Sequence, residues 1–205
     1  MKSGVRVTGG AFRGRGLAVP AGTRPTGGRV REALFSIWRE RLDGARFLDL
    51  FAGSGVVGLE AAGRGALRVV CVDQDRAAVR SIAANAALLG EAQVEVCRLT
   101  LPTGLPRLGG RGAAGDGGEV GAGRFDLVFA DPPYSFDAYE ALLGGAAPLL
   151  ATEGELAVEH AARRELPLTA GSLARVDIRR YGESAVSFYR TARGPASETA
   201  PAGEP

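Results

Sequence analysis

Apolar and polar residues follow one another along this chain in blocks that predict strands and helices in turn. From residue 46 onward, short apolar runs such as residues 47–51 alternate with longer segments in which apolar residues recur every three or four positions. Short continuous runs are typical of buried strands, and the wider spacing is typical of amphipathic helices. The predicted strands are 46–51, 67–72, 93–97, 125–130, 154–159, 173–179 and 184–190, and the predicted helices are 56–63, 76–89 and 136–150.

Strands separated by helices predict an α/β fold with a mainly parallel twisted sheet and helices on both faces. The last two strands lack an intervening helix, so we expect them to form an antiparallel pair at the sheet edge. Residues 1–45 are expected to form an N-terminal extension, with a small β-hairpin within 4–20 and a helix from Arg29 to Leu42. The expected body spans residues 46–190.

Two stretches contain too little apolar sequence to predict packed structure. Residues near 103–123 are rich in glycine and are expected to form a mobile insertion. Residues 191–205, rich in Ala, Pro and Gly, are expected to form a disordered tail. The rest is long enough for one core, because single domains commonly reach roughly 200 residues.

Composition narrows the class of protein. Hydrophobic residues make up 45% of the 205 residues, yet no apolar stretch reaches the roughly 18 residues that span a bilayer, and the N-terminus lacks the apolar segment of a secretory signal. Cys71 and Cys97 lie in Val-rich runs, which favours burial as small apolar side chains over a disulfide. No Cys or His spacing indicates a metal. We therefore expect a soluble, cytoplasmic monomer without a membrane partner.

Positive charge is concentrated near the N-terminus. Residues 1–46 contain ten basic and three acidic residues, a net charge of +7, so the remainder carries −5 of the overall +2. A basic extension on an acidic body indicates a polyanionic partner, because neutralising phosphates releases counterions. An arginine-rich chain encoded by a GC-rich genome is the alternative explanation.

A glycine-rich turn follows the first strand of the body. Residues 53–58 satisfy the G-x-G-x-x-G pattern, and Asp73 ends the next strand at the spacing expected of a ribose-binding acid. This pattern fits a nicotinamide dinucleotide as well as S-adenosylmethionine. Asp49 favours the methyl donor, because a carboxylate there would repel a pyrophosphate and attract the ammonium group of a methionine moiety.

A second motif, Asp131-Pro132-Pro133-Tyr134, ends the apolar run 125–130. Its prolines fix φ and remove two backbone donors, which makes the loop stiff. Asp131 and the Pro132 carbonyl are candidates to accept hydrogen bonds from an aromatic amine, and Tyr134 offers a ring on which a flipped base can stack. Alternatively, the prolines only end a strand and Asp131 caps a helix, an interpretation that the turn upstream weakens.

Three other features have structural interpretations beside functional ones. Asn85, in an otherwise apolar helix, is interpreted as solvated or capping. His160, the only histidine, is interpreted as structural, because no Ser or Cys nucleophile motif accompanies it. Residues 179–182, Arg-Arg-Tyr-Gly, fit either contact with phosphate or a solvated turn at the sheet edge.

With these residues identified, the chain resembles the RsmD family, bacterial methyltransferases that modify the N2 amine of one guanine in 16S ribosomal RNA. The resemblance extends over nearly all of residues 4–190. It is carried by motifs that begin at Arg6 (Arg-Val-x-Gly-Gly-x-Phe-Arg-Gly), Thr23 (Thr-Arg-Pro-Thr), Arg29 (Arg-Val-Arg-Glu-Ala-Leu-Phe), Leu48 (Leu-Asp-Leu-Phe-Ala-Gly-Ser-Gly), Asp131 (Asp-Pro-Pro-Tyr), Val158 (Val-Glu-His) and Arg180 (Arg-Tyr-Gly).

The resemblance implies a Rossmann-like class I methyltransferase fold, S-adenosyl-L-methionine as cofactor, and methylation of guanine N2, expected at guanine-966, in 16S rRNA of the small ribosomal subunit or its assembly intermediates. It implies that Asp131, Pro132, Pro133 and Tyr134 hold the guanine. It implies donor contacts by Asp49, Phe51, Gly53, Ser54, Gly55, Asp73 and Thr100, and RNA contacts by Arg6, Arg13, Arg24, Arg29, Arg31 and Arg180.

The chain departs from the family pattern at two places. Members commonly carry an acid after the third strand that helps hold the adenine, whereas this chain reads Cys-Arg-Leu-Thr at 97–100, so that contact falls to Thr100 or to the backbone. Gly27-Gly28 replaces a more usual Thr-Asp before Arg29.

Asp131 separates the nearest alternatives. Amino methyltransferases that act on DNA adenine or cytosine usually carry Asn at this place. Guanine presents an N1–H beside its amine, and a carboxylate can accept from both, whereas an amide also brings donors. The alternatives are a methyltransferase of DNA or other RNA amino groups, a nicotinamide oxidoreductase, and a non-catalytic RNA-binding assembly protein.

Overall fold

The structure, a computed structural model, describes residues 4–20, 27–90, 93–109 and 124–192. The predictions for Arg24, for the glycine-rich residues 110–123 and for the tail from residue 193 lie outside these described residues.

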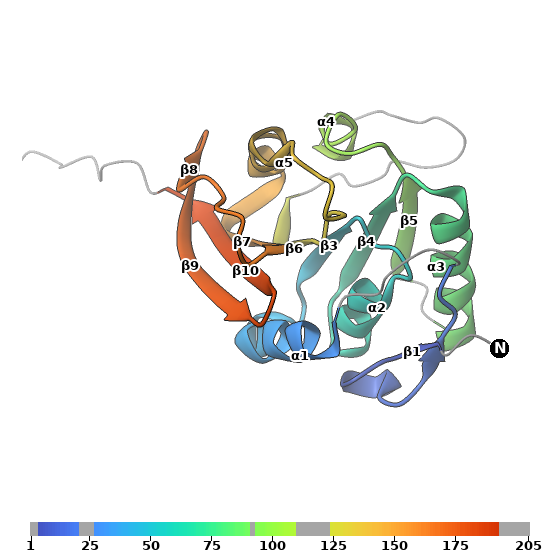
Figure 1. Ribbon diagram of the computed structural model, residues 1–205. Helices are drawn as coiled ribbons and strands as arrows, with labels where there is room; N and C mark the ends of the chain where they lie inside the picture. Colours follow the sequence, from blue (N-terminus) through green and yellow to red (C-terminus); the bar gives the residue numbers. More distant parts are fainter. Residues whose placement is uncertain (1–3, 21–26, 91–92, 110–123, 193–205) are drawn as a thin grey trace, which may run out of the picture.

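Eight strands of the described chain form one central sheet (Figure 1). In space their order is β5-β4-β3-β6-β7-β10-β9-β8. The first five strands in that order, β5 to β7, run parallel to one another, and β10 runs antiparallel to both β7 and β9. The chain order reverses between β3 and β6, and ligands of such sheets bind outside the carboxyl ends of the strands at that point. The strands are β3 (Arg46–Leu50), β4 (Arg68–Asp73), β5 (Val94–Arg98), β6 (Phe125–Ala130), β7 (Leu150–Ala161), β8 (Thr169–Ala170), β9 (Leu173–Tyr181) and β10 (Ser184–Thr191).

Helices cover both faces of this sheet (Figure 1). Phe47 and Val69 pack toward one set of helices, and their neighbours Leu48 and Val70 pack toward the other. This alternation follows from the two-residue period of a strand, and it leaves the parallel strands buried on both sides. One face carries α1 (Gly28–Ile37), α2 (Val56–Gly63) and α3 (Arg76–Leu89), and the other carries α4 (Pro106–Gly109) and α5 (Tyr139–Ala146).

The N-terminal extension packs on the face that α1, α2 and α3 cover. Its hairpin pairs β1 (Val5–Arg6) with β2 (Gly16–Leu17), and the short 3₁₀ helix η1 (Gly10–Phe12) lies against α2. A Cβ added at Gly63 would come within 2.6 Å of the Phe12 ring, so the glycine permits this close approach. Val7 and Leu17 belong to the same apolar cluster as the three helices, so the extension and the body share one core.

Glu60 of α2 ties the extension to the body. Its side chain is fully buried and accepts hydrogen bonds from the N–H and hydroxyl of Thr8, from Arg31 Nε at 3.1 Å and from Arg64. Arg31 also donates to the Arg6 carbonyl at 2.7 Å. A buried carboxylate is costly unless it is paired, and here both oxygens receive donors from three separate segments.

The predicted order of strands and helices is confirmed, and α2, α3 and β6 have the predicted bounds. Capping explains the clear limits of α3. Asp75 accepts from the N–H of Ala77 at the N-terminus, and Gly90 ends the helix with a left-handed φ of 75°.

Three predictions about local structure are corrected. The first helix ends at Ile37 and gives way to the 3₁₀ helix η2 (Arg39–Arg41). The helix predicted at 136–150 is α5 followed by the 3₁₀ helix η3 (Ala147–Leu149), because the Phe136 N–H turns back to the Pro133 carbonyl. Residues 103–109, predicted as part of a mobile insertion, contain α4, whose neighbourhood buries Leu105 and Leu108 against α5 and η3.

Every helix in the described ranges is too short or too polar to cross a bilayer. Within the same ranges, no group of three or more His, Cys, Asp and Glu side chains is arranged to hold a metal ion.

Candidate active site

A cleft of about 640 Å³ opens at the carboxyl ends of β3, β4, β6 and β7. Gly27, Arg29 and Val30, at the start of α1, line one part of it. We call its two main sides the glycine wall and the proline wall. The glycine wall consists of Phe51, Ala52, Gly53, Ser54, Val56, Asp73, Gln74, Asp75 and Ala78, and the proline wall consists of Asp131, Pro132, Pro133, Tyr134, Glu159, Tyr181, Glu183 and Ser184.

Hydrogen bonds fix the glycine wall to β4. The Gly53 N–H donates to Asp73 Oδ2 at 2.8 Å, and the Asp75 N–H donates to Oδ1 of the same carboxylate at 2.9 Å. The Ala52 N–H donates to the Val72 carbonyl at 3.0 Å. Gly53 has a φ of 56°, a left-handed conformation that glycine adopts without a steric penalty. Asp73 therefore shapes the turn as well as lining the cleft.

Ser54 contributes a buried hydroxyl to this wall. Its residue is 2% exposed, and within the described chain Oγ has no hydrogen-bond partner. Its carbonyl accepts from Asn85 Nδ2 at 3.1 Å. A buried hydroxyl without a partner costs roughly 1–3 kcal/mol, so a polar ligand in the cleft that bonds Ser54 would remove that cost.

Asp49 lies behind the glycine wall and is not part of the cleft lining. It is 2% exposed, and its Oδ2 accepts from the Gly58 N–H at 2.9 Å. Burial raises the pKa of Asp49 to about 8; the Gly58 hydrogen bond opposes the rise, and the charges of Asp131 and Asp73 add to it. Asp49 thus supports the first turn of α2 from behind the cleft.

Backbone hydrogen bonds and ring packing both support the proline wall. The Asp131 N–H lies 3.4 Å from the Leu50 carbonyl, a long hydrogen bond, and the Pro133 carbonyl accepts from the Phe136 N–H at 2.8 Å. The Phe136 ring meets the Phe51 ring edge to face, with centroids 5.3 Å apart. Tyr134 is 62% exposed, so its ring is open to a large partner.

Phe51 connects the two walls. Its backbone begins the glycine turn with a φ of 60°, which is uncommon for a residue with a side chain, and its ring supports the loop that carries the proline wall. Such strain is found where the surrounding structure determines the conformation, as at binding sites.

The charge of the cleft is strongly negative. Among its described lining residues, five carry carboxylates, and Arg29 is the only Lys or Arg. A cationic ligand is favoured in such a cleft, whereas a pyrophosphate is disfavoured. The carboxylates belong to Asp73, Asp75, Asp131, Glu159 and Glu183.

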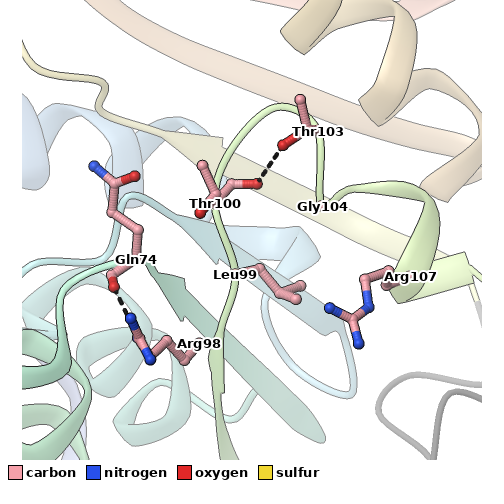
Figure 2. Close-up of a pocket in the computed structure, with 7 residues that line it drawn as sticks. All are labelled: Gln74, Arg98, Leu99, Thr100, Thr103, Gly104 and Arg107. Atoms are coloured by element: carbon pink, nitrogen blue, oxygen red, sulfur yellow. Dashed lines mark hydrogen bonds between the residues drawn. The ribbon is translucent and has the colours of Figure 1, made fainter.

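Thr100, predicted to contact the donor, lies in an adjoining hollow of about 360 Å³ (Figure 2). Gln74 borders both this hollow and the cleft. The Thr100 carbonyl accepts from the Thr103 hydroxyl at 3.3 Å, and Arg98 Nε donates to the Gln74 carbonyl at 3.0 Å. Figure 2 shows Arg98 beside Gln74, with Arg107 across the strand end from it. Basic and hydroxyl groups thus stand where the family pattern leads one to expect an acid.

Comparison with known proteins identifies the family. The family described as "Conserved hypothetical protein 95" matches residues 5–190. YlbH of Bacillus subtilis (strain 168) is 34% identical over 190 residues, which are 91% of this chain and 98% of YlbH. Ribosomal RNA small subunit methyltransferase D of Escherichia coli (strain K12) is 36% identical over 132 residues, which are 63% of this chain and 60% of that protein. The chain belongs to the RsmD family.

A solved structure supports the fold of this RsmD-family protein. The yhhF protein of Escherichia coli, described as a methyltransferase, matches it with a TM-score of 0.75 and 30% identity, over 93% of this chain and 99% of that chain. With its mainly parallel sheet and antiparallel β10, the chain has the Rossmann-like class I methyltransferase fold that the resemblance implied.

Four of the arginines predicted to contact RNA in this RsmD-family chain are exposed: Arg6, Arg13, Arg29 and Arg180. Arg29 lies at the cleft, and Arg6 donates to the Gly14 carbonyl at 2.9 Å, which stiffens the hairpin. Their exposure keeps them as candidates for phosphate contact.

The prediction that Arg31 contacts RNA is wrong. Its side chain is 2% exposed and forms the ion pair with Glu60. Burial lowers the pKa of Arg31, and the charge and hydrogen bond of Glu60 oppose that change. Arg31 therefore anchors the extension and does not present its charge to solvent.

The interpretation of Asn85 as solvated or capping is also wrong, because it is 2% exposed and bonds both Ser54 and Ala18. His160 is buried with its ring nitrogens against Ser187 Oγ and the Ala161 carbonyl, which agrees with a structural role.

The sequence reasoning missed several residues of the proline wall. Glu159 is 7% exposed and lies on β7 beside the end of β6. The residue before it, Val158, pairs with Ala130, the residue before Asp131. The place of Glu159 at the end of the neighbouring parallel strand was the signal that could have identified it. Tyr181, Glu183 and Ser184 come from the turn between β9 and β10, and no pattern in the sequence directs that turn to the cleft.

Proposed function

We propose that the protein transfers a methyl group from S-adenosylmethionine to the exocyclic N2 amine of a guanine in 16S rRNA, with guanine-966 as the expected position, on the small subunit or its assembly intermediates. One observation carries the proposal: a single cleft joins the glycine wall and the residues 131–134. The name of the Escherichia coli relative, ribosomal RNA small subunit methyltransferase D, supports the choice of substrate.

The glycine wall fits the donor. Ser54 offers a buried hydroxyl to a polar group of the ligand, and Asp73 offers carboxylate oxygens at the rim to ribose hydroxyls. Phe51 and Gly53 line the same wall, while Asp49 and Gly55 shape it from behind. The donor supplies an electrophilic methyl group on a sulfonium cation, which suits a cleft with five carboxylates. Thr100 is proposed to act at the adenine end, through the hollow that Gln74 shares with the cleft.

The proline wall is proposed to hold the guanine. Asp131 accepts a hydrogen bond from N2, and the Pro132 carbonyl accepts a second, which directs the nitrogen lone pair toward the methyl group. Tyr134 stacks on the flipped base, because aromatic rings replace the stacking that the base loses in RNA. Positioning supplies most of the acceleration, and Asp131 accepts the proton that the amine releases as its bond to carbon forms.

Asp131 favours guanine over adenine or cytosine. The N1–H and N2–H groups of guanine are neighbouring donors, and a carboxylate can accept from both. Adenine and cytosine instead place a ring acceptor beside the amine, which a carboxylate repels.

RNA phosphates are proposed to contact the exposed arginines outside the acidic cleft. Arg6, Arg13, Arg29 and Arg180 are exposed in the structure, and Arg24 is proposed from the sequence alone. This division leaves the base in the negative cleft and the backbone on positive side chains. Binding that depends on these arginines weakens steeply as salt rises, and a flat salt response would contradict it.

The experiment that tests the proposal offers labelled S-adenosylmethionine with deproteinised 16S rRNA, assembled 30S subunits and DNA. Transfer to rRNA or to 30S particles, followed by mass spectrometry that maps the methyl group to guanine N2, is the expected result. Transfer to DNA alone would support the DNA amino methyltransferase instead. Binding to 30S particles without any transfer would support the non-catalytic assembly protein.

A further inference from the structure

One side chain joins the N-terminal hairpin to the glycine wall. Asn85 of α3 accepts from the Ala18 N–H through Oδ1 at 3.0 Å, and its Nδ2 donates to the Ala18 carbonyl at 3.0 Å and to the Ser54 carbonyl at 3.1 Å. Ala18 directly follows β2, and Ser54 lines the cleft. A single buried amide therefore contacts both the basic hairpin and the proposed donor turn.

The three hydrogen bonds of Asn85 depend on one another. An Asn amide has two donors and one acceptor oxygen, and Asn85 is 2% exposed, so water does not readily replace a lost partner. If Ala18 moves away, the amide loses two of its three hydrogen bonds, and its rotation is no longer restrained by them. Rotation removes the donor from the carbonyl of Ser54, a residue of the turn that lines the cleft.

The hairpin depends on the body for its stability. Its strands β1 and β2 are two residues long, and an isolated two-stranded hairpin of this size is not stable in water. Docking therefore depends on contacts with the body: Val7 and Leu17 in the shared core, Thr8 at Glu60 and Ala18 at Asn85. Residues 4–20 also carry three arginines and no acidic residue, so a polyanion is attracted to this element.

We infer that Asn85 is a positioning residue that couples RNA binding at the hairpin to donor binding in the cleft. The inference rests on the proposed function. RNA that enters the cleft and contacts the hairpin favours the docked hairpin, because both contacts require one fixed geometry. The docked hairpin keeps Asn85 on the Ser54 carbonyl and keeps the donor turn in its binding conformation. By linkage, the donor strengthens RNA binding by the same factor.

The test measures this coupling directly by calorimetry on the full chain. S-adenosylhomocysteine, which cannot transfer a methyl group, is titrated with and without saturating 16S rRNA. In the unaltered protein we expect RNA to tighten its binding on the order of 10-fold. In Asn85→Asp, which keeps the acceptor for the Ala18 N–H but loses both donated hydrogen bonds, the factor should fall to about 2-fold or less.

Ser81→Ala is the matched control. Ser81 lies on the same helix and donates to the same Ala18 carbonyl at 3.0 Å, yet it has no hydrogen bond to the glycine wall. Its removal takes one hydrogen bond from the Ala18 carbonyl and leaves all three hydrogen bonds of Asn85 in place, so coupling should stay near that of the unaltered protein. Equal coupling in Asn85→Asp and in the unaltered protein would overturn the inference, as would an equal loss in Ser81→Ala.

A second measurement needs no substitution. Hydrogen exchange at the amides of Gly53 and Gly55 in the turn, and of Gly58 in the first part of α2, should slow when 16S rRNA is added to the unaltered protein without donor. Unchanged exchange at these amides, with RNA bound, overturns the inference even if Asn85→Asp does not fold. Failure of the donor to bind, or of the protein to methylate rRNA, would instead refute the proposed function.

Discussion

The two walls of the cleft are built by different means. The glycine wall is fixed by short hydrogen bonds, from Gly53 to Asp73 and from Asn85 to Ser54, and by glycines in left-handed conformations. In the proline wall the Asp131 N–H makes a long bond of 3.4 Å to the Leu50 carbonyl, the Phe136 ring packs on Phe51, and Tyr134 is 62% exposed. A small ligand is best bound by a wall that is already formed, whereas a base swung out of a large RNA needs an open one.

The largest difference between the two walls is expected when Asp131 of the proline wall is replaced. Asp131→Ala should lower the rate of methyl transfer by about 10²–10⁴-fold, because the amine loses both a hydrogen-bond acceptor and the group that takes its proton. Donor affinity, measured by calorimetry, should change little. Asp137→Ala, which removes an exposed carboxylate from the same loop, serves as the control and should keep the rate. A normal rate in Asp131→Ala would sink the proposed mechanism.

The buried support of the glycine wall should make stability depend on pH. Asp49 ionises near 3.8 when unfolded and near 8 when folded, so between these values the folded state holds a proton that the unfolded state has released. The free energy of unfolding should therefore fall as pH rises from 4 to 8, by up to about 1.4 kcal/mol per pH unit. Asn cannot ionise and can still accept from Gly58, so Asp49→Asn should lack this slope. Urea denaturation at pH 5, 6, 7 and 8 measures both proteins, and parallel curves would contradict the assignment.

The rigidity of the glycine wall can be tested at Gly55. Its φ is 76°, and an added Cβ would meet Ile82 at 2.9 Å, so Gly55→Ala combines backbone strain with a collision. We expect a loss of roughly 1–3 kcal/mol in stability and weaker donor binding. Gly90→Ala provides the comparison, because φ is 75° there and the added Cβ meets nothing within 4 Å. If thermal denaturation shows equal losses for the two variants, packing against Ile82 is not what holds the turn.

The smallest effect is expected at Tyr134. Tyr134→Ala should raise the KM for RNA roughly 10-fold, since stacking on one aromatic side chain contributes about 1–3 kcal/mol per base. Tyr134→Phe keeps the ring and should behave like the unaltered protein. Because the ring is exposed, neither change should alter the melting temperature much. Steady-state methylation at varied RNA concentration decides, and equal KM values for the two variants would remove the stacking role.

The sequence was most informative where structure is local. Periodic apolar residues predicted α2, α3 and β6 at their observed bounds, and the strand ends placed both motifs of the cleft on the correct edge of the sheet. Those features need only a strand, a turn and a parallel sheet, which are properties of short segments.

The predictions failed where a partner comes from far along the chain. The family resemblance implied that Arg31 contacts RNA, but no local pattern shows that Glu60, 29 residues later, is its partner. Asn85 was read as solvated because Ala18 lies 67 residues before it. Leu105 and Leu108 border a glycine-rich stretch, yet they are buried in the same apolar cluster as residues of α5. Each of these outcomes depends on tertiary contact, which overrides the local pattern.

Glu60 has a consequence for exchanging parts between relatives. Its carboxylate receives donors from the hairpin, from α1 and from Arg64 just after α2, so the N-terminal extension is not a detachable module. A chimera that takes its extension from one protein and its α2 from another inherits half of this junction, and an unpaired buried charge costs about 3–5 kcal/mol. The extension and α2 must therefore be transplanted, and inherited, as one unit.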